Sequence, residues 1–248
     1  MTTLTTNYLT PTGREEAWRF TPLKRLGGMY DGSAIVADRH SLTLAGSKAT
    51  GVSFELKSSS DAPVLSESDD AIVGRIREAA RDVAVLTISA NTEVAEPIIL
   101  KRNPGDVKSA EFSRVQIKVE NHASATIIVE NTGDTHLAED VEIFVAPGAN
   151  LTLVSLQEWG ENTVHAGRQH AIVDRDANFK SIVVTIGGSL VRLLPTVEFA
   201  GPGASCELFG VYFATSGQFF EHRMFVDHKV PNAKSRVNYK GALAGDQA

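Results

Sequence analysis

Four short stretches that each open on alanine decide how this chain folds. In each stretch the second residue is small and polar, the third is expected to point inward and the fourth is polar. They are Ala123-Ser124-Ala125-Thr126, Ala149-Asn150-Leu151-Thr152, Ala177-Asn178-Phe179-Lys180 and Ala204-Ser205-Cys206-Glu207. The copies start at positions 123, 149, 177 and 204, so successive copies are 26, 28 and 27 residues apart. A nearly constant spacing in this range indicates a repeat architecture.

The sequence between the copies consists of turns and strands. Apolar and polar residues alternate over 115–119, 141–145 and 151–153, which is the period of half-buried strands. Each copy also follows a stretch typical of a turn. These stretches are Glu120-Asn121-His122, Ala146-Pro147-Gly148, Asp174-Arg175-Asp176 and Gly201-Pro202-Gly203.

We therefore predict a mainly β protein whose residues 83–248 form a right-handed parallel β-helix, a single-stranded solenoid. An antiparallel sandwich with evenly spaced hairpins is the alternative fold. The recurring alanine favours the solenoid, because identical corners of successive turns must stack closely.

Residues 1–82 are predicted to form a small N-terminal region that contains helices. One helix is expected near 13–20, because Thr12 and Glu15 have the spacing of a capping box and Pro22 disfavours its continuation. Trp18 would anchor this helix on the rest of the protein. A second helix is expected near 69–81, where apolar residues recur with the helical period. Its candidate caps are Ser66 and Ser68, followed by acidic Asp69 and Asp70.

Composition narrows the function classes. The 248 residues include 24 basic and 30 acidic side chains, a net charge of −6, which argues against nucleic acid or an anionic membrane as a partner. The single cysteine, Cys206, cannot form an internal disulfide. The N-terminus lacks the basic start and apolar run of a signal peptide, and no apolar run reaches the ~18 residues of a membrane span. We expect a cytoplasmic protein.

Two further stretches carry a resemblance to a known family. They are Gly13-Arg14-Glu15-Glu16-Ala17-Trp18-Arg19-Phe20-Thr21-Pro22-Leu23 and Asp227-His228-Lys229-Val230-Pro231-Asn232-Ala233-Lys234-Ser235-Arg236-Val237-Asn238-Tyr239-Lys240-Gly241. The first resembles the N-terminal signature of SufD proteins, and the second resembles the motif shared by SufB and SufD cores. Leu190-Val191-Arg192 and Gly210-Val211-Tyr212 also match residues of that family. The resemblance runs nearly end to end.

The resemblance implies a non-catalytic scaffold subunit of the SUF iron–sulfur cluster assembly complex, paired with SufB and the SufC ATPase. The nascent cluster would form in the full complex, so no catalytic, cofactor-binding or metal residue is expected in this chain alone. The positions carried over have structural or interface roles. They are Arg14, Glu15, Trp18, Arg19, Pro22, Asp227, His228, Pro231, Ser235, Tyr239, Lys240 and Gly241.

Family members continue well beyond the Tyr-Lys-Gly motif, so the chain resembles a C-terminally incomplete SufD. The missing part would hold the SufC-docking surface and the histidine implicated in cluster assembly. Residues 242–248 are too few and too weakly hydrophobic to cap a solenoid turn. Since an uncapped turn exposes apolar interior and unpaired strand edges, we expect self-association through the open end.

Other chemically suggestive residues have simpler interpretations. Cys206 shares its repeat position with apolar residues, so we expect a core side chain. His222 and His228 would lie on one face of a single strand about 20 Å apart, too far to share a metal. His165 and His170 are expected in a loop.

The alternative function is a β-helix carbohydrate-active enzyme, a polysaccharide lyase or hydrolase. Asp174 and Asp176 would be its acid–base pair. Both fall in a turn of the repeat, which explains them without catalysis.

Overall fold

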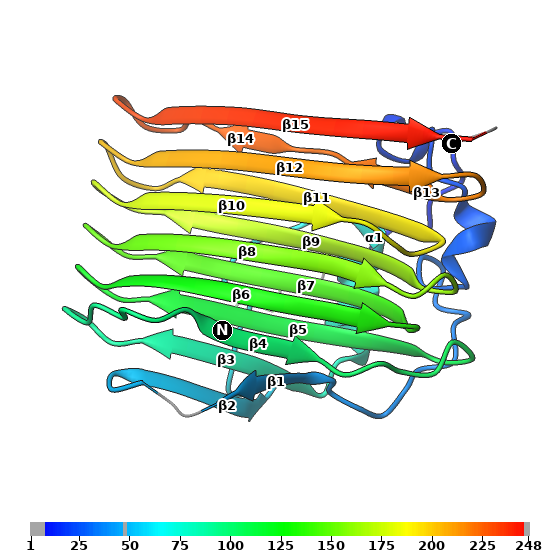
Figure 1. The fold of residues 1–248 in the computed structure, drawn as a ribbon, viewed down its shortest axis with the longest axis horizontal. Coiled ribbons are helices and arrows are strands. Elements are labelled where there is room, and N and C mark those ends of the chain that lie inside the picture. The colour runs from blue at the N-terminus through cyan, green and yellow to red at the C-terminus, as the bar shows by residue number, and fades with distance from the viewer. Residues whose placement is uncertain (1–7, 47–48, 246–248) are drawn as a thin grey trace.

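The computed structural model of the protein describes residues 8–46 and 49–245. The ends of both predicted regions, residues 1–7 and 246–248, lie outside it. The described chain is mainly β and winds into a β-solenoid of about six turns (Figure 1). The predicted fold class, a parallel β-helix, is confirmed. No helix among the described residues is long and apolar enough to cross a membrane.

Two sheets form the walls of the solenoid, and each turn contributes a strand to both. The first sheet has seven strands in the order β1-β4-β6-β8-β10-β12-β15. Its strands are β1 (Leu42–Ala45), β4 (Ile98–Arg102), β6 (Ser124–Gly133), β8 (Asn150–Trp159), β10 (Asn178–Thr185), β12 (Ser205–Thr215) and β15 (Lys234–Ala244).

The second sheet has eight strands, of which seven follow the order β13-β11-β9-β7-β5-β3-β2 and β14 also pairs with β11. Its strands are β2 (Val52–Ser58), β3 (Asp82–Ile88), β5 (Ala110–Val119), β7 (His136–Val145), β9 (Val164–Val173), β11 (Leu190–Phe199), β13 (Phe219–His222) and β14 (Phe225–Asp227). Neighbouring strands of both sheets are parallel except at β1–β4 and β2–β3.

The four alanines of the repeat line up at one corner, as the sequence predicts. Ser124 pairs with Asn150, Asn150 with Asn178 and Asn178 with Ser205 in consecutive parallel strands. The alanine before each of these residues is completely buried. The register continues to Lys234, so Ala233 begins a fifth copy that the sequence analysis missed. The antiparallel sandwich is thereby excluded.

The helix predicted near 13–20 differs in type and length from the one that forms. Only a short 3-10 helix, η1 (Glu16–Trp18), forms there, and a second, η2 (Leu23–Leu26), follows Pro22. The expected capping contact exists, because the Thr12 amide donates to Glu15 Oε2 at 3.0 Å. Gly13 adopts a left-handed φ of 84° inside this contact, so the backbone turns instead of starting an α-helix.

The second helix, α1 (Ala71–Ala79), lies within the predicted range, but its cap differs from the expected serines. Asp70 is the N-cap residue, and its Oδ1 accepts from the amides of Ile72 at 3.0 Å and Val73 at 3.3 Å. The predicted boundary at residue 82 stays a prediction. Strand β2 pairs with β3 across it, so the N-terminal region joins the solenoid through a sheet.

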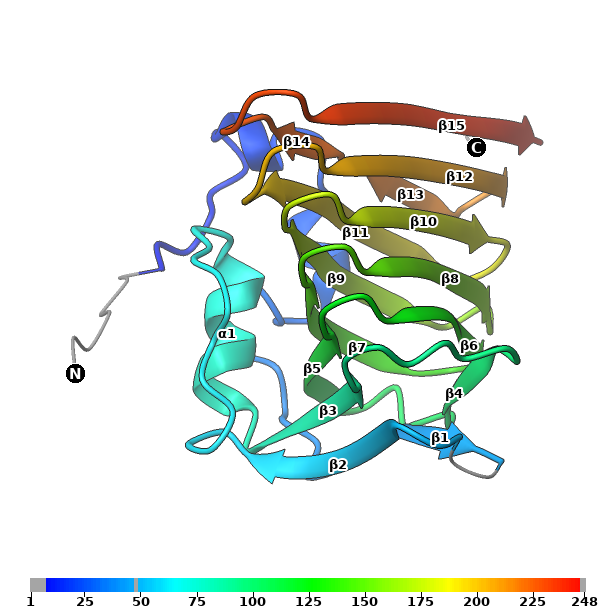
Figure 2. The same ribbon diagram turned by 90° about the vertical axis from the view of Figure 1, so that its left-hand side faces the viewer.

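Helix α1 lies against the outer face of the eight-stranded sheet, crossing strands β5, β7 and β9 (Figure 2). A layer of charged side chains fills this contact. Arg168 Nε donates to Asp140 Oδ1 at 2.8 Å, and Arg77 of α1 pairs with the other oxygen of Asp140 at 3.3 Å. Glu142 accepts from the Leu65 amide at 2.9 Å. Such pairing is what allows charges to be buried beneath a helix.

Candidate functional site at the β11–β15 end of the solenoid

The N-terminal motif docks on the β11–β13 end of the solenoid through one buried arginine. The Arg192 guanidinium lies 3.8 Å from the Trp18 ring centroid, and it pairs with Asp70 at 2.9 Å. Arg192 is 1% exposed, so this cation–π contact acts without competition from water. Asp70 therefore serves both as the α1 cap and as the counter-ion of Arg192.

Further hydrogen bonds tie the same motif to the late strands. Thr21 Oγ1 donates to Glu221 Oε2 at 2.6 Å, and the Arg223 guanidinium donates to the Ala17 carbonyl at 2.8 Å. Arg25, two residues beyond the motif, donates to the carbonyls of Ser189 and Gly217. These contacts join residues that are 164 to 206 positions apart in the sequence.

The other predicted positions of the N-terminal motif have different surroundings. Arg14 and Arg19 are exposed, and Arg19 lies over the Phe20 ring at 5.5 Å. Glu15 closes the turn at Thr12, and Pro22 precedes η2. Within this motif Trp18 is buried against Arg192, as an anchor would be, and Thr21 and the Ala17 carbonyl add hydrogen bonds.

Two reciprocal tyrosine–glycine pairs join β12 to β15. Gly210 is opposite Tyr239, and Tyr212 is opposite Gly241. A Cβ atom on Gly210 would lie 2.1 Å from the Tyr239 ring, and one on Gly241 would lie 2.1 Å from the Tyr212 ring. Each tyrosine ring therefore occupies space that only a glycine on the neighbouring strand leaves free.

His222, at the end of β13, lies among these rings. Its ring stacks on Tyr212 with centroids 5.4 Å apart and is 5.8 Å from the Tyr239 ring. His222 Nε2 is 3.1 Å from Thr185 Oγ1. Burial lowers the pKa of His222 to about 4, so the imidazole is neutral near pH 7.

A hollow of about 400 Å³ opens beside this histidine. It brings Phe20 of the N-terminal motif and Tyr239 of the C-terminal motif into one site. Its lining residues are Phe20, Tyr212, Phe219, Phe220, Glu221, His222, Met224 and Tyr239. The lining is mostly aromatic, and its titratable side chains are Tyr212, Glu221, His222 and Tyr239.

The remaining C-terminal motif residues organise the turn between β14 and β15. His228 Nε2 lies 3.0 Å from Ser235 Oγ, and its ring meets Phe199 edge-on at 4.9 Å. Lys229 bridges Glu198 at 3.0 Å and Asp227 at 3.5 Å.

Pro231 is exposed in that turn, and Lys240 is exposed on the outer face of β15. The predicted C-terminal positions are thus divided between this turn and the aromatic site around Tyr239.

Several predictions about histidines need correction. His222 and His228 do not share one strand, because β13 ends at His222 and β14 begins at Phe225. They are separate, hydrogen-bonded histidines, as expected. His165 and His170 lie in strand β9 and not in a loop. His165 is fully buried, which lowers its pKa to about 3.

The acidic pair of the alternative enzyme belongs to a turn. Asp176 has a left-handed φ of 55°, and Asp174 Oδ1 accepts from the Arg175 amide at 2.6 Å. Cys206 is buried in the core as predicted, and burial raises the pKa of its thiol to about 12. Within residues 8–46 and 49–245, no group of three or more His, Cys, Asp or Glu side chains is arranged to hold a metal.

Sequence reasoning did not assign their roles to the residues on which the site depends most: Arg192, Asp70 and His222. Arg192 stands in a family-like tripeptide, but an isolated arginine in a strand carries no signal that it is buried. Tyr212 could have been found, because Gly210-Val211-Tyr212 and Tyr239-Lys240-Gly241 mirror each other 29 residues apart, one solenoid turn.

Comparison with known proteins agrees with this architecture. Residues 101–248 match the family described as SUF system FeS cluster assembly, SufBD core domain. An iron-sulfur cluster assembly SufBD family protein of Mycobacterium tuberculosis H37Rv is 38% identical over 242 residues, covering 96% of this chain and 60% of the relative. Its counterpart in Mycobacterium leprae is 36% identical over 238 residues, covering 95% and 60%.

A more distant relative, from Staphylococcus epidermidis, is 26% identical over 133 residues, covering 51% of this chain and 28% of its own length. The chain spans about 60% of the length of the mycobacterial relatives. From the family match and the mycobacterial identities, the chain belongs to the SufBD family of iron–sulfur cluster assembly proteins.

Proposed function

We propose that the chain is a non-catalytic scaffold subunit of the SUF machinery that pairs with a SufB-type subunit and a SufC-type ATPase in the cytoplasm. The family match over residues 101–248 supports a role in cluster assembly. The observation that carries the scaffold role is the docking of Trp18 on Arg192, which fixes the N-terminal motif to the late strands. A rigid surface built from both family motifs is a preorganised surface for a partner.

The surroundings of the reactive side chains support a non-catalytic role. Cys206 is buried with a raised thiol pKa, so it is a poor sulfur ligand at neutral pH. His165 is buried and His222 is partly buried, both with lowered pKa values, and Asp174 and Asp176 form a turn. We therefore propose that a nascent cluster is handled only together with partner subunits.

Co-expression with the SufB and SufC homologues of the same organism tests the pairing. A tagged chain should co-purify with the SufB homologue and co-elute with it in size-exclusion chromatography. Trp18→Ala should weaken this association, because it releases the N-terminal motif from Arg192. Arg81→Ala is a matched control, since Arg81 forms only an exposed ion pair with Asp38.

The proposal would be overturned if the folded chain bound neither homologue under conditions in which the longer mycobacterial relative bound its own. If folded Trp18→Ala still bound the SufB homologue, the pairing would stand and only the role of Trp18 docking in it would be wrong. Circular dichroism of each variant separates loss of binding from loss of fold.

A further inference from the structure

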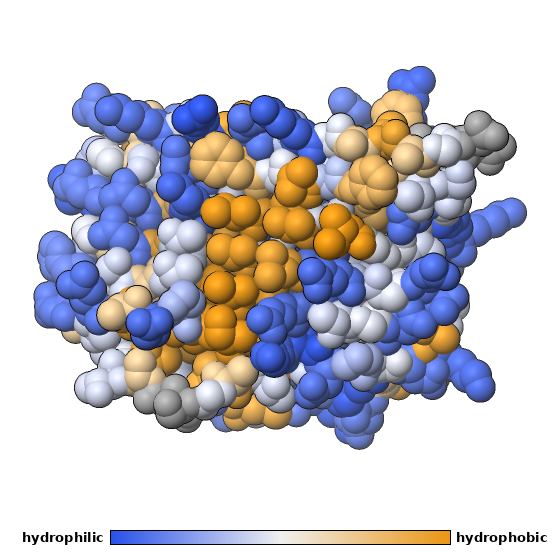
Figure 3. Space-filling view, viewed as in Figure 1, coloured by the Kyte–Doolittle hydropathy of each residue, from blue (hydrophilic) through white to orange (hydrophobic). Residues whose placement is uncertain are grey.

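The outer face of the seven-stranded sheet carries a continuous band of apolar side chains (Figure 3). Strand pairing aligns these residues across β4, β6, β8, β10 and β12. We call this band the apolar stripe. It consists of Ile99, Ile128, Val154, Leu156, Ile182, Val184, Ile186, Phe209, Val211 and Phe213.

Three residues at the β12 end of the stripe are about half exposed. Val211 is 50% exposed, Ile186 49% and Phe213 47%. Contiguous exposed apolar surface marks an interaction site more often than isolated apolar residues do. The opposite sheet shows how this protein covers such a face, because α1 lies there along the solenoid axis (Figure 2). Among the described residues, no helix covers the stripe.

The dimensions of the stripe indicate which kind of structural element can bind there. Five strands about 4.8 Å apart give a length of roughly 20 Å, and three alternate positions along a strand give a width of about 13 Å. The resulting area, on the order of 300 Å², is far below the ~800 Å² per partner of a standard interface between globular proteins. It matches one α-helix of about 14 residues, whose diameter is about 10–12 Å.

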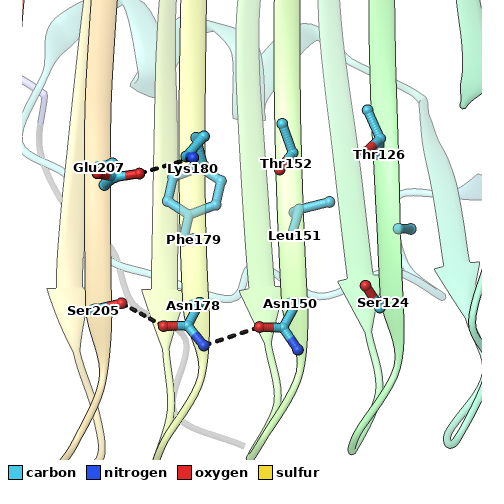
Figure 4. A pocket seen from close by; sticks show the side chains of 11 residues that line it. Ser124, Thr126, Asn150, Leu151, Thr152, Asn178, Phe179, Lys180, Ser205 and Glu207 are labelled. Carbon is cyan, nitrogen blue, oxygen red and sulfur yellow. Dashed lines mark hydrogen bonds and ion pairs between the residues drawn. The ribbon is translucent and has the colours of Figure 1, made fainter.

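A shallow polar groove lies on the same sheet face, toward the N-terminal ends of the strands from the stripe (Figure 4). The groove has a volume of about 250 Å³ and is lined by a ladder of Ser124, Asn150, Asn178 and Ser205. Asn178 Nδ2 donates to Asn150 Oδ1 at 2.9 Å, and Ser205 donates to Asn178. One outward row lies between this ladder and the stripe, and it consists of Thr126, Thr152, Lys180 and Glu207.

Charge gives the bound helix a direction. At the β15 end, Lys234, Arg236 and Lys240 are exposed, and none forms an ion pair within the described part of the chain. Lower on the face, Lys101 is paired with Glu130 at 3.1 Å and Lys180 with Glu207 at 2.9 Å. A helix with acidic residues in its last turn, and the negative end of its dipole, would therefore point toward β15.

We propose that the apolar stripe is the docking site for an amphipathic helix of a partner protein. The helix lies along the solenoid axis, with its apolar face on the stripe and an acidic C-terminal turn at β15. This proposal does not depend on the identity of the SUF partners.

A synthetic 14-residue amphipathic peptide with leucines on one face and two glutamates in its last turn tests the site. Its binding to the whole chain is measured by fluorescence anisotropy. A scrambled peptide of equal composition, and one with the glutamates in the first turn, serve as comparisons. We expect binding at least about tenfold weaker for the scrambled peptide, a difference of about 1.4 kcal/mol, and weaker binding for the reversed charge pattern.

Val184→Asp in the stripe should weaken peptide binding at least about tenfold. Thr132→Asp is the matched control, because Thr132 is exposed on the same sheet outside the stripe and should leave binding unchanged. Val211→Glu repeats the test at a half-exposed position if Val184→Asp fails to fold.

Equal binding of the scrambled peptide, or unchanged binding by both stripe variants, would overturn the proposal. A dimer of the chain alone that Val184→Asp dissociates in sedimentation experiments would also overturn it, because the stripe would then be an interface between copies.

Discussion

At the scale of single residues, the aromatic site depends on glycines as much as on tyrosines. Gly210→Ala would place a methyl group against the Tyr239 ring, which also packs near the His222 ring at 5.8 Å. We expect destabilisation of about 1–3 kcal/mol, as for overpacked cores. Chemical denaturation measures it. In the control double variant with Tyr239→Ala, the added methyl should cost much less, and strictly additive effects would contradict the steric explanation.

Cys206 offers a second test at the residue scale. Burial and a thiol pKa raised to about 12 both oppose reaction of the native protein with Ellman's reagent. We expect labelling only as fast as the protein unfolds, and rapid labelling in denaturant. Rapid stoichiometric labelling under native conditions would show that the solenoid opens at this turn.

His222 makes stability depend on pH. Its folded pKa of about 4 lies below the unfolded value of about 6.5, so the unfolded state binds more protons between these values. Its contribution is present above pH 6.5 and is lost as the pH falls toward 4, reaching a loss of about 2 kcal/mol at pH 5. Glu139 and Asp140, whose pKa values burial raises, act in the opposite direction.

The difference between wild type and His222→Gln isolates this residue from those carboxyl groups. Thermal melts at pH 7 and pH 5 should show a smaller loss for the variant. Equal losses in the two proteins would mean that His222 is accessible to protons in the folded state.

At the scale of elements, one aspartate links helix, tryptophan motif and solenoid. Asp70→Asn retains a good N-cap side chain but removes the charge beside buried Arg192. Leaving a buried cation with only the more distant Glu221 should cost at least about 2 kcal/mol. Asp69→Asn is the matched control, since Asp69 is exposed, and should change the unfolding free energy by less than about 0.5 kcal/mol.

The same elements show what the sequence could and could not predict. Period-two alternation and aligned alanines predict the strands, because each turn repeats the same local environment. The α1 range was predictable from its apolar period, but the choice of Asp70 over Ser66 and Ser68 depends on Arg192, 122 positions away. The capping contact between Thr12 and Glu15 does not start an α-helix, because Gly13 adopts a left-handed backbone conformation. The aromatic site depends on side chains that meet only once the turns are stacked.

At the scale of the whole molecule, each turn of a solenoid contacts only its neighbours, so stability should vary along the axis. Strands such as β7 and β9 are paired on both sides, whereas β15 pairs only with β12 among the described residues. In native-state hydrogen exchange we expect the strongest protection in β5 to β9 and the weakest in β15, whose side chains are mostly exposed.

The same exchange experiment, repeated at high protein concentration, tests self-association through the exposed edge of β15. An unpaired strand edge offers amide and carbonyl groups to a second chain. If copies pair there, β15 amides should gain protection as concentration rises, while protection in β7 stays constant. Uniform protection at low concentration would contradict the gradient, and concentration-independent exchange of β15 would contradict the self-association. Because the Val184→Asp variant changes the sheet face and leaves the edge intact, it should behave like wild type here.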